Sequence, residues 1–592
     1  MITGKKRVAI LSLIAIAGWI IWLFVFDTTT PHLPSVSGSP DIRLNQEGFY
    51  THGPKIAIVK NAPGGKFFVR KQPEGQVVFT DTLTEARRWE FSGEVVRKAD
   101  FSALAEPGNY YLDIPMVGIS YAFRITSAVN SGLQKAVLRS FYYQRASTPI
   151  ELPYAGEWPR KAGHRDDQVK IHVSAASASR PEGTRVSSSR GWYDAGDYGK
   201  YVPTATFSTW MLLDLYGQYP AYYDTLSLNI PESSNSLPDI LDESLWSIRW
   251  LLTMQDPVEG FVCHKLTTTL HARKVMPKED QNTRLMIGKS TAATLSFAAV
   301  MARASGTFRK WEPSLADSCL KAAQAAWVWG RKNPSVGFEN PEDIETGPCR
   351  DDNFEDERAW AAAELWAITG EDSFYRAGNF VKKNYEDAPS RRNTGPLAWM
   401  TLLEHSEKLP AGEGKILLQK LSAIADRYRD HALNVSAYGV PLGERENDFV
   451  WGGNGNLASR GVVLMFMARK TGEKSYANAA TSALDYIMGR NATGYCFVTG
   501  FGTQPPQNIH HRISLADGIV SPIPGLMVGG PQNELNRDEC MYPDSLPATK
   551  YLDDFCSYTT NEVTINWNAP LAWLTGAVEQ WYGTFEENTP RK

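Results

Sequence analysis

The sequence GWYDAGDYGKYV, residues 191–202, places two carboxylates, Asp194 and Asp197, three positions apart among glycines and aromatic residues. Glycines allow the backbone to turn sharply at such a place. Aromatic faces beside acids suit a sugar, whose rings stack on π surfaces and whose hydroxyls need hydrogen-bond acceptors. The same pattern is also typical of a loop whose aspartates cap backbone groups. The rest of the chain has to decide between these two interpretations.

Length and composition limit the classes of protein to which the chain can belong. Its 592 residues exceed one ordinary hydrophobic core, which predicts two domains or one large repetitive domain. The net charge of -4 and the absence of a long basic run argue against nucleic acid as a partner. The six cysteines form no C-x-x-C pair, so neither a disulfide framework nor a zinc cage is indicated, and we expect mostly buried thiols.

The N-terminal stretch predicts a membrane anchor. Residues 8–26 are uncharged and would span about 28 Å as a helix, close to the thickness of a bilayer core. Basic residues before this run and Asp27 after it orient the N-terminus toward the cytoplasm. We therefore predict a cytoplasmic tip and signal-anchor helix over residues 1–26, a linker over residues 27–40, and the body outside the cytoplasmic membrane, periplasmic or extracellular. Secretion after cleavage of a signal peptide is the alternative, although no clear A-x-A site follows the run.

Residues 41–127 predict a small β domain. Short apolar or alternating runs at 55–59, 67–70 and 110–114 are separated by turn sequences rich in Pro and Gly. Short strands with this turn chemistry indicate a β-sandwich of immunoglobulin type. No cluster of catalytic residue types lies in it, so we expect a packing or spacer role.

Residues 128–592 read as helix after helix, which makes the chain mostly α. Residues 356–370 form an alanine-rich run that ends on glycine, as a helix C-cap does. The sequence TGEDSF at 369–374 is echoed by TGEKSY at 471–476. Repeated helical hairpins predict either a stacked solenoid or a closed α/α toroid, and periodicity alone does not choose between them.

Two further stretches carry the residue types of a catalytic site. They are YLDDFCSYTTNEVTINWNAP, residues 551–570, and GFGTQPPQNIHHR, residues 500–512. Three loops of this kind on helical hairpins are what a site on one face of a helical barrel needs. Taken singly, His510 and His511 could be a solvated pair, and Glu562 could be a capping residue. Adjacent histidines cannot share a helix face as i, i+4 zinc ligands do, which argues against a catalytic zinc.

Together the three stretches resemble glycoside hydrolase family 9, the inverting cellulase family. Smaller segments agree with the resemblance: LPDILDE at 237–243, STAAT at 290–294, and Asp356-Glu357. The resemblance covers nearly everything after the anchor and linker. It implies an immunoglobulin-like domain at 41–127 packed on an (α/α)6 barrel at 128–592 with an open substrate cleft. The barrel follows from the resemblance and not from the helical periodicity.

The resemblance also implies the catalytic roles. Hydrolysis with inversion needs a protonated acid at the leaving oxygen and a carboxylate that activates water on the other ring face, about 6.5–9.5 Å away. By resemblance, Asp197 is the general base, Asp194 helps to hold the water, and Glu562 is the general acid. Glu562 must stay protonated near neutral pH, which requires apolar surroundings or a nearby negative charge. Asp553 could supply that charge or orient the substrate.

Substrate contacts are expected from polar and aromatic side chains around these acids. His510 and Arg512 would hold sugar hydroxyls through directional hydrogen bonds. The candidate stacking platforms are Trp192, Tyr193, Trp451, Tyr558 and Trp567. Each of these rings could instead belong to the hydrophobic core.

The resemblance bears on metals as well. Relatives often carry a zinc site built partly on cysteines, but Ala146 and Gly163 stand where cysteines would be expected, so zinc is not expected here. Relatives also often bind calcium near the position of Asp356-Glu357. Asp352, Asp356 and Glu357 are therefore candidate ligands of a structural calcium, although a solvated helix start looks the same. The expected catalysis requires no cofactor.

The function predicted is hydrolysis of β-1,4-glucosidic bonds in cellulose-type glucans or cellodextrins, with inversion of configuration. The expected partners are the glucan and, through the N-terminal helix, the membrane. One alternative is an exo-acting glycosidase on glucosamine-containing, chitosan-type oligosaccharides, since the family includes such activities. The other is a non-catalytic sugar-binding protein, which the presence of Asp194, Asp197 and Glu562 argues against.

Overall fold

The computed structural model describes residues 38–533, 537–538, 540–542 and 546–583. The predicted signal-anchor at 1–26 and the linker up to residue 37 lie outside these residues. Among the helices that are described, none is both long enough and apolar enough to cross a membrane.

The N-terminal domain is a sandwich of two sheets, as predicted. One sheet has the order β1 (Ile42–Arg43), β3 (Ile56–Lys60), β7 (Glu94–Asp100), β6 (Arg87–Trp89). The other has the order β2 (Phe49–Tyr50), β10 (Phe123–Thr126), β8 (Gly108–Ile114), β4 (Lys66–Lys71), β5 (Gln76–Thr82), with β9 (Gly118–Ile119) beside β8. Tyr110, Leu112 and Ile114 alternate with more exposed neighbours along β8, which is the period expected of a strand with one face in the core.

The rest of the chain is mostly helical. The longer helices are α2 (Ser131–Gln144), α4 (Val202–Gln218), α6 (Asp239–Met254), α7 (Thr291–Thr307), α8 (Pro313–Lys332), α9 (Glu355–Thr369), α10 (Asp372–Gly378), α11 (Gly395–Glu404), α12 (Glu413–Asp430), α13 (Gly453–Thr471), α14 (Lys474–Ile487) and α17 (Ile565–Tyr582). Helices α4, α7, α9, α11, α12, α13 and α17 contact one another in this order, and α17 returns to α4. The helices therefore form a closed ring and not an open solenoid. Helix α4 is buried along almost its whole length, as expected of a helix inside such a ring.

The sequence repeat corresponds to two helix–helix corners. Helix α9 ends before Gly370 (φ 71°) and helix α13 before Gly472 (φ 76°), both in the left-handed conformation that favours glycine. The next helices, α10 and α14, begin two residues later in each case. The repeated sequence thus marks the same turn at two places in the ring.

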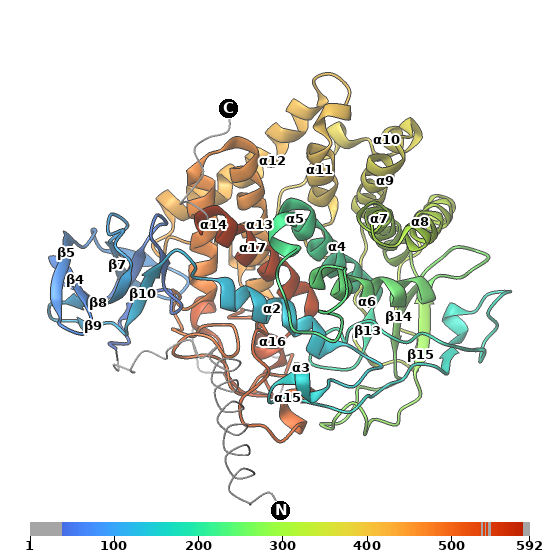
Figure 1. Ribbon diagram of the computed structural model, residues 1–592, viewed down its shortest axis with the longest axis horizontal. Helices are drawn as coiled ribbons and strands as arrows, with labels where there is room; N and C mark the ends of the chain where they lie inside the picture. The colour runs from blue at the N-terminus through green and yellow to red at the C-terminus, as the bar shows by residue number, and fades with distance from the viewer. Residues whose placement is uncertain (1–37, 534–536, 539, 543–545, 584–592) are drawn as a thin grey trace, which may run out of the picture.

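The sandwich lies beside the helical body (Figure 1), and buried side chains join the two. The Trp89 ring lies 4.4 Å from that of Tyr438, between ring centroids, and Trp89 belongs to the core of the body. The Tyr50 hydroxyl donates to Glu579 on α17 at 2.5 Å. These contacts make the sandwich a packed part of the molecule rather than a loosely tethered module.

One end of the helical body carries the loops of interest. Figure 1 places the short helices α3 (Leu152–Ala155), α15 (Arg512–Ala516) and α16 (Tyr558–Asn561) at this end. Nearby runs a third sheet in the order β12 (Arg185–Val186), β11 (Val169–Ile171), β15 (Leu285–Lys289), β14 (Cys263–Thr267), β13 (Lys200–Tyr201). The segments at 191–201 and 551–564 lead into α4 and α17, which are neighbours in the ring.

The cysteines depart from expectation at one pair. Cys263, Cys319 and Cys496 are buried thiols, as predicted. Cys540 and Cys556, however, form a disulfide, although no disulfide was indicated by the sequence. A separation of 16 residues between two cysteines does not by itself predict a disulfide, and the fold of the loop brings the two residues together.

Candidate active site

The stretch at 191–202 forms a tight loop that is held from several sides. Gly196 approaches the neighbouring loop so closely that a Cβ at this position would lie 2.0 Å from the carbonyl oxygen of His510. Only glycine fits there. The side-chain amide of Gln144, at the end of α2, donates to the carbonyl of Ala195 at 3.1 Å. The loop is thus fixed against the His510 loop and against the end of α2.

Backbone hydrogen bonds join the three sequence-predicted stretches. The Arg512 N–H donates to the Gly196 carbonyl at 3.0 Å, and the Ile565 N–H donates to the Asp194 carbonyl at 2.9 Å. The His510 N–H donates to the Asn561 carbonyl at 2.9 Å. Segments that are more than 300 residues apart in the chain therefore form one site.

The two aspartates of the loop have opposite electrostatic environments. Burial raises the pKa of Asp194 to about 7, against a hydrogen bond from the Thr204 hydroxyl, and the charge of Asp197 raises it further. Burial would also raise the pKa of Asp197, but a hydrogen bond and charge from His271, together with the charge of Arg512, hold it below its usual range. The His271 Nδ1 lies 2.8 Å from the Asp197 Oδ2. Near neutral pH Asp197 is therefore ionised, whereas Asp194 retains a proton on part of the molecules.

Glu562 lies between α16 and α17 and is partly exposed. Burial raises the pKa of Glu562 well above its usual value, and the negative charges of Asp197 and Asp194 raise it further, against the charge of Arg512. The site thus holds one carboxylate that is ionised and one carboxylic acid that keeps its proton near neutral pH. This is the pairing that an acid–base reaction requires.

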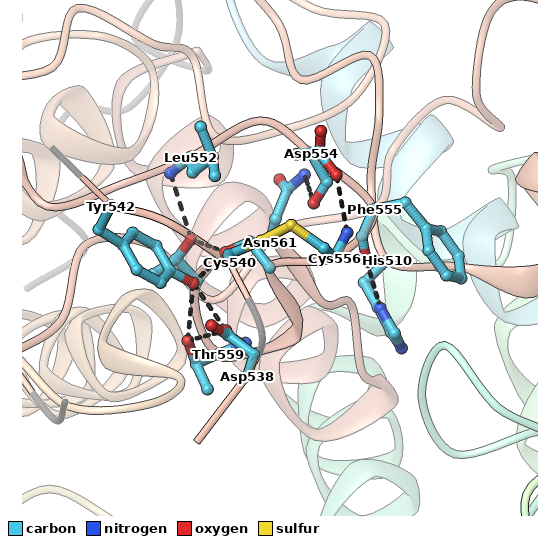
Figure 2. Close-up of a disulfide and its surroundings, with 12 residues drawn as sticks. His510, Asp538, Cys540, Tyr542, Leu552, Asp554, Phe555, Cys556, Thr559 and Asn561 are labelled. Carbon is cyan, nitrogen blue, oxygen red and sulfur yellow. Dashed lines mark hydrogen bonds between the residues drawn. A yellow bond between two sulfur atoms is a disulfide. The ribbon is translucent and has the colours of Figure 1, made fainter. Parts of the chain in front are cut away.

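The His510 ring is hydrogen-bonded to the backbone of Phe555 (Figure 2). Its Nδ1 lies 2.6 Å from the Phe555 carbonyl oxygen, and its ring stacks on Phe555 with 4.5 Å between centroids. A carbonyl can only accept, so Nδ1 carries the proton and Nε2 is left as an acceptor. Burial, and then the charges of Arg512 and His271, lower the pKa of His510 to about 4, so the ring is neutral at pH 7. A neutral acceptor suits a sugar hydroxyl, and that contact stays a prediction.

Asp553 holds the loop that precedes His510. Its carboxylate accepts the backbone N–H groups of Gln507 and Asn508 at 2.8 and 2.9 Å, and the Asn561 amide at 3.1 Å. Asp553 therefore organises this loop, and its predicted part in catalysis stays a prediction.

Arg512 ties loops together as well as carrying charge. Its Nε donates to the Ala272 carbonyl at 2.9 Å and its Nη1 to the Gly196 carbonyl at 3.1 Å. Its charge lowers the pKa of both Asp197 and Glu562. The predicted contact of Arg512 with a sugar hydroxyl stays a prediction.

The candidate stacking platforms divide into two groups. Trp192 and Tyr193 are fully buried, so neither ring has a face for a sugar, and this expectation is wrong. The Trp192 indole donates to Glu243 at 2.7 Å, and the Tyr193 hydroxyl lies 2.9 Å from His164 Nδ1. Trp451, by contrast, is 37% exposed, and its ring lies 5.5 Å from that of Tyr558.

Trp567 occupies an intermediate position. It is partly buried, and its ring lies over Gly452 and Gly455 at the start of α13. The two glycines leave the space that the indole fills. Because Trp567 is packed in this way and Trp192 and Tyr193 are buried, Trp451 and Tyr558 are the aromatic pair best placed to receive a sugar.

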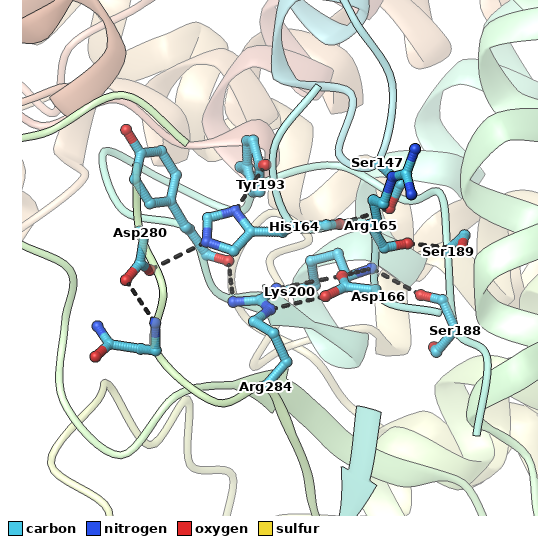
Figure 3. A network of polar contacts seen from close by, with 12 residues as sticks. Ser147, His164, Arg165, Asp166, Ser188, Ser189, Tyr193, Lys200, Asp280 and Arg284 are labelled. Atoms are coloured by element: carbon cyan, nitrogen blue, oxygen red, sulfur yellow. Dashed lines mark hydrogen bonds and ion pairs between the residues drawn. The ribbon is translucent and has the colours of Figure 1, made fainter. Parts of the chain in front are cut away.

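A buried ion-pair network lies behind the aspartate loop (Figure 3). Asp166 is paired with Arg284 Nε at 2.9 Å and with Lys200 Nζ at 2.7 Å. Burial would raise the pKa of Asp166, but the charges of Arg284 and Lys200 hold it below its usual value. Arg284 also donates to the Tyr198 carbonyl at 2.9 Å, and Lys200 to the Arg190 carbonyl at 2.8 Å. The network thus binds the aspartate loop near both of its ends, at Arg190 and at Tyr198.

In the region where relatives are expected to carry zinc, the position of Gly163 has no room for a cysteine side chain. A Cβ on Gly163 would lie 2.4 Å from Pro277. Within the described part of the chain, one group of three His, Cys, Asp or Glu side chains has its ligand atoms close enough together for a metal ion: Cys540, Asp554 and Cys556. Its two sulfurs are joined in the disulfide, so it is not a zinc site.

The predicted calcium ligands are placed differently from expectation. Asp356 and Glu357 are buried at the start of α9, but Asp352 is exposed, and Asp351 is buried in its place. Within the described residues, Asp351 Oδ2, Asp356 Oδ1 and Glu357 Oε2 have no hydrogen-bond partner. Burial raises the pKa of each of the three acids. Oxygen is the ligand type that a hard cation takes, although these three residues do not form a group of ligand atoms within 4.8 Å of one another.

Sequence reasoning did not identify two residues of the site. His271 lies after β14 in the segment TTTLHA, and Thr204 lies in the first turn of α4. His271 is far from Asp197 in the sequence and meets it only through the fold, so no sequence signal could have found it. Thr204 is ten residues from Asp194, but nothing in the local sequence marks its hydroxyl as the partner of that acid.

Comparisons with known proteins agree with this geometry. The family model "Glycosyl hydrolase family 9" matches residues 131–575, and "Cellulase N-terminal ig-like domain" matches residues 37–118. A xyloglucan-specific endo-β-1,4-glucanase of Bacteroides ovatus is 39% identical over 562 residues, covering 92% of this chain and 95% of the relative. Endoglucanase D of Acetivibrio thermocellus is 34% identical over 552 residues, covering 91% and 83%. A solved structure of a Bacteroides ovatus GH9 protein superposes with a TM-score of 0.86 at 39% identity, covering 92% of this chain and 99% of that one.

Proposed function

The chain belongs to glycosyl hydrolase family 9, and from this membership we propose that it hydrolyses β-1,4-glucosidic bonds of cellulose-type glucans or cellodextrins with inversion. One observation carries the assignment of roles. Asp197 and Glu562 lie on loops joined by backbone hydrogen bonds, and their environments push their pKa values in opposite directions. We also propose that the ring of helices is the (α/α)6 barrel of the family, with this site at one end.

The proposed reaction follows from the two protonation states. Glu562 gives its proton to the glycosidic oxygen while the bond from that oxygen to the anomeric carbon breaks. Asp197 takes a proton from a water molecule, whose oxygen attacks the same carbon from the opposite face. Asp194, which retains a proton on part of the molecules near pH 7, helps to hold the water. The product carries the inverted anomeric configuration.

The substrate class rests on the exposed aromatic pair and on the relatives. Trp451 and Tyr558 offer neighbouring rings that are at least partly exposed, on which a glucose unit can stack, and Tyr558 is near enough to Glu562 to feel its charge. The Bacteroides ovatus relative is named for xyloglucan, a branched β-1,4-glucan, so this polymer is a second candidate substrate. Reducing-end assays on carboxymethylcellulose, xyloglucan, cellotetraose and chitosan oligomers separate the candidates. Activity confined to the chitosan oligomers would support the glucosaminidase alternative and refute the proposal.

Substitution of the two acids tests the assigned roles. Asp197→Ala and Glu562→Ala should each lower kcat by a factor of about 10²–10⁴ or more on cello-oligosaccharides, because each removes a proton-transfer group of the transition state. The melting temperature of each variant, measured by calorimetry, should show that it still folds. Asp352→Ala, at an exposed acid, is the matched control and should keep full activity. Near-native turnover by either variant would show that the roles are wrongly assigned.

We propose that Asp351, Asp356 and Glu357 hold a structural calcium ion, which would offset the repulsion among three buried acids. Removing calcium with a chelator should then lower the melting temperature, and added calcium should restore it. Glu357→Gln should abolish this calcium dependence, whereas Asp352→Asn should leave it unchanged. A melting temperature that does not respond to chelator or calcium in the wild type would contradict the site.

We further propose that the enzyme works outside the cytoplasmic membrane. The disulfide between Cys540 and Cys556 supports an oxidising compartment. The apolar run at residues 8–26 is the proposed anchor, and its cleavage would instead release the enzyme. Fractionation with an antibody against the body decides between the two. Protein recovered only in the cytosol would contradict both.

A further inference from the structure

We propose that His271 is a positioning residue for the base: it holds one oxygen of Asp197 in a hydrogen bond and leaves the other oxygen for the attacking water. The inference rests on the role proposed above for Asp197. It concerns a residue that lies outside the three stretches by which the site was predicted.

The contact between His271 and Asp197 is short, and the two side chains differ in solvent exposure. His271 Nδ1 lies 2.8 Å from Asp197 Oδ2, which is hydrogen-bonding distance. The His271 side chain is 41% exposed, whereas that of Asp197 is 9% exposed. The more exposed imidazole therefore covers part of the buried carboxylate of Asp197.

The segment that carries His271 is fixed to the other loops of the site. The Ala272 carbonyl accepts from Arg512 Nε at 2.9 Å, and the Val275 carbonyl accepts from the Tyr198 hydroxyl at 2.6 Å. Lys274 Nζ lies 4.5 Å from the centroid of the Phe555 ring, on which His510 stacks. The backbone around His271 is thus held by both the base loop and the loops beside the acid. The position of the His271 side chain beside Asp197 is therefore fixed by its backbone.

The charges around Asp197 determine what the loss of His271 would do. The titratable and charged groups that act on Asp197, or on which its charge acts, are Asp194, Tyr201, Lys265, His271, Cys349, His510, Arg512 and Glu562. After burial, His271 is the largest influence on the pKa of Asp197, ahead of Arg512, and it lowers that pKa. Without His271 only Arg512 and backbone groups oppose the effect of burial. Removing His271 should therefore raise the pKa of Asp197, so that the base becomes protonated at a higher pH than in the wild type.

The pH dependence of kcat/KM is the measurement that separates positioning from other roles, because its acidic limb reports the base of the free enzyme. His271→Phe removes the hydrogen-bond donor while keeping a planar ring. It should move the acidic limb upward by about one pH unit, because the ionised form of Asp197 loses the partner that favours it. His271→Asn keeps a neutral donor near the position of Nδ1 and should give a smaller shift with partial recovery of kcat.

The control is a second histidine–carboxylate pair, His172 with Asp343 at 3.3 Å. His172→Asn should leave both limbs of the profile unchanged. If His271 only bound a sugar hydroxyl, His271→Phe would raise KM and leave the acidic limb in place, and that outcome would overturn the proposal. An unchanged profile with unchanged kcat would overturn it as well.

The experiment also separates failure of this inference from failure of the proposed function. If the wild type hydrolyses the glucan and Asp197→Ala does not, but His271→Phe keeps the wild-type profile, only the inference about His271 fails. If Asp197→Ala keeps near-native turnover, the role of Asp197 fails and the inference fails with it. Unchanged melting temperatures of the His271 variants exclude misfolding as the cause of any shift.

Discussion

Asp194 and Asp197 are three residues apart on one loop, yet the fold gives them opposite protonation behaviour. Asp194 accepts a hydrogen bond from the neutral Thr204 hydroxyl, whereas Asp197 faces His271 and the charge of Arg512. The sequence places the two acids together, but only the side chains brought in from other elements distinguish them. Glu562 belongs to the same set, because the charge of Asp197 helps to keep it protonated.

The raised pKa of Asp194 has a cost in stability that depends on pH. Its folded-state pKa of about 7 lies above the value of about 3.9 for an unfolded aspartate. Its contribution to stability is therefore fully present below pH 4 and is lost as the pH rises through 7. Asp194→Asn lacks this loss, so its melting temperature relative to wild type should increase between pH 4 and pH 8. Calorimetry at one-unit pH steps measures the difference.

Asp197→Asn provides the control of opposite sign. The pKa of Asp197 is lowered in the folded protein, so its contribution is present above the unfolded pKa and is lost only as the pH falls. The deficit of Asp197→Asn relative to wild type should thus stay nearly constant from pH 5 to pH 8 and shrink in more acidic solution. A flat difference for Asp194→Asn across pH 4–8 would mean that Asp194 does not hold a proton near neutrality.

At the scale of elements, the loop at 191–202 is shaped by groups that belong to other segments. The buried network of Asp166, Arg284 and Lys200 grips it from behind (Figure 3). Gly196 allows it to touch the loop of His510, and the N–H of Ile565 at the start of α17 donates to it. The loop that carries the two aspartates is in this way positioned by neighbouring segments and by two buried ion pairs.

Asp166→Asn should both destabilise the protein and reduce its activity. The substitution leaves two buried cations without their counter-charge, which typically costs about 3–5 kcal/mol. Because Lys200 and Arg284 also bind the carbonyls of Arg190 and Tyr198, kcat should fall although both residues are buried. Melting temperature and kcat on cellotetraose measure the two effects.

The control for Asp166 is the ion pair of Arg309 and Asp317, which is largely exposed. Asp317→Asn should change stability by about 1 kcal/mol or less, as surface pairs do, with no effect on kcat. Equal effects of the two substitutions would show that the network does not support the loop.

At the scale of the whole molecule, the sandwich and the helical body share part of their packing. The sandwich has a core of its own, but Tyr50, Ile58, Trp89 and Val96 belong to the core of the body. The Asn45 amide donates to the buried Asp485 at 2.8 Å, so polar contacts also cross the boundary. The two parts are expected to unfold together.

Trp89→Ala tests this coupling. Removing a large buried aromatic side chain typically costs about 3–5 kcal/mol, and here the cost falls on the boundary where Trp89 meets Tyr438. Calorimetry should show one transition for the wild type and two for the variant, with the sandwich melting apart from the body. Phe67→Ala, within the core of the sandwich alone, is the control: it should lower the melting temperature but keep a single transition, because the boundary is intact. Two transitions in the wild type would contradict a shared core.

The sequence predicts much of this arrangement because some signals are local. The strands around 56–60 and 108–114, the helix that ends at Gly370, and the acids Asp194, Asp197 and Glu562 all follow from short-range patterns or from the family resemblance. His271, Thr204 and Asp351 could not be predicted, because each meets its partners through the fold. Trp192 and Tyr193 were mistaken for sugar platforms, because an aromatic residue beside an acid reads alike whether it is buried or exposed.

The closure of the ring between α4 and α17 has a consequence for how the protein is made. A ribosome synthesises α17 after every other helix described here, so the flank of α4 against which it packs stays uncovered until then. The partner of the Asp194 carbonyl, the N–H of Ile565, arrives equally late. A nascent chain halted before that point would display an apolar trough and lack Glu562, which makes it a client for chaperones and proteases rather than a weaker enzyme.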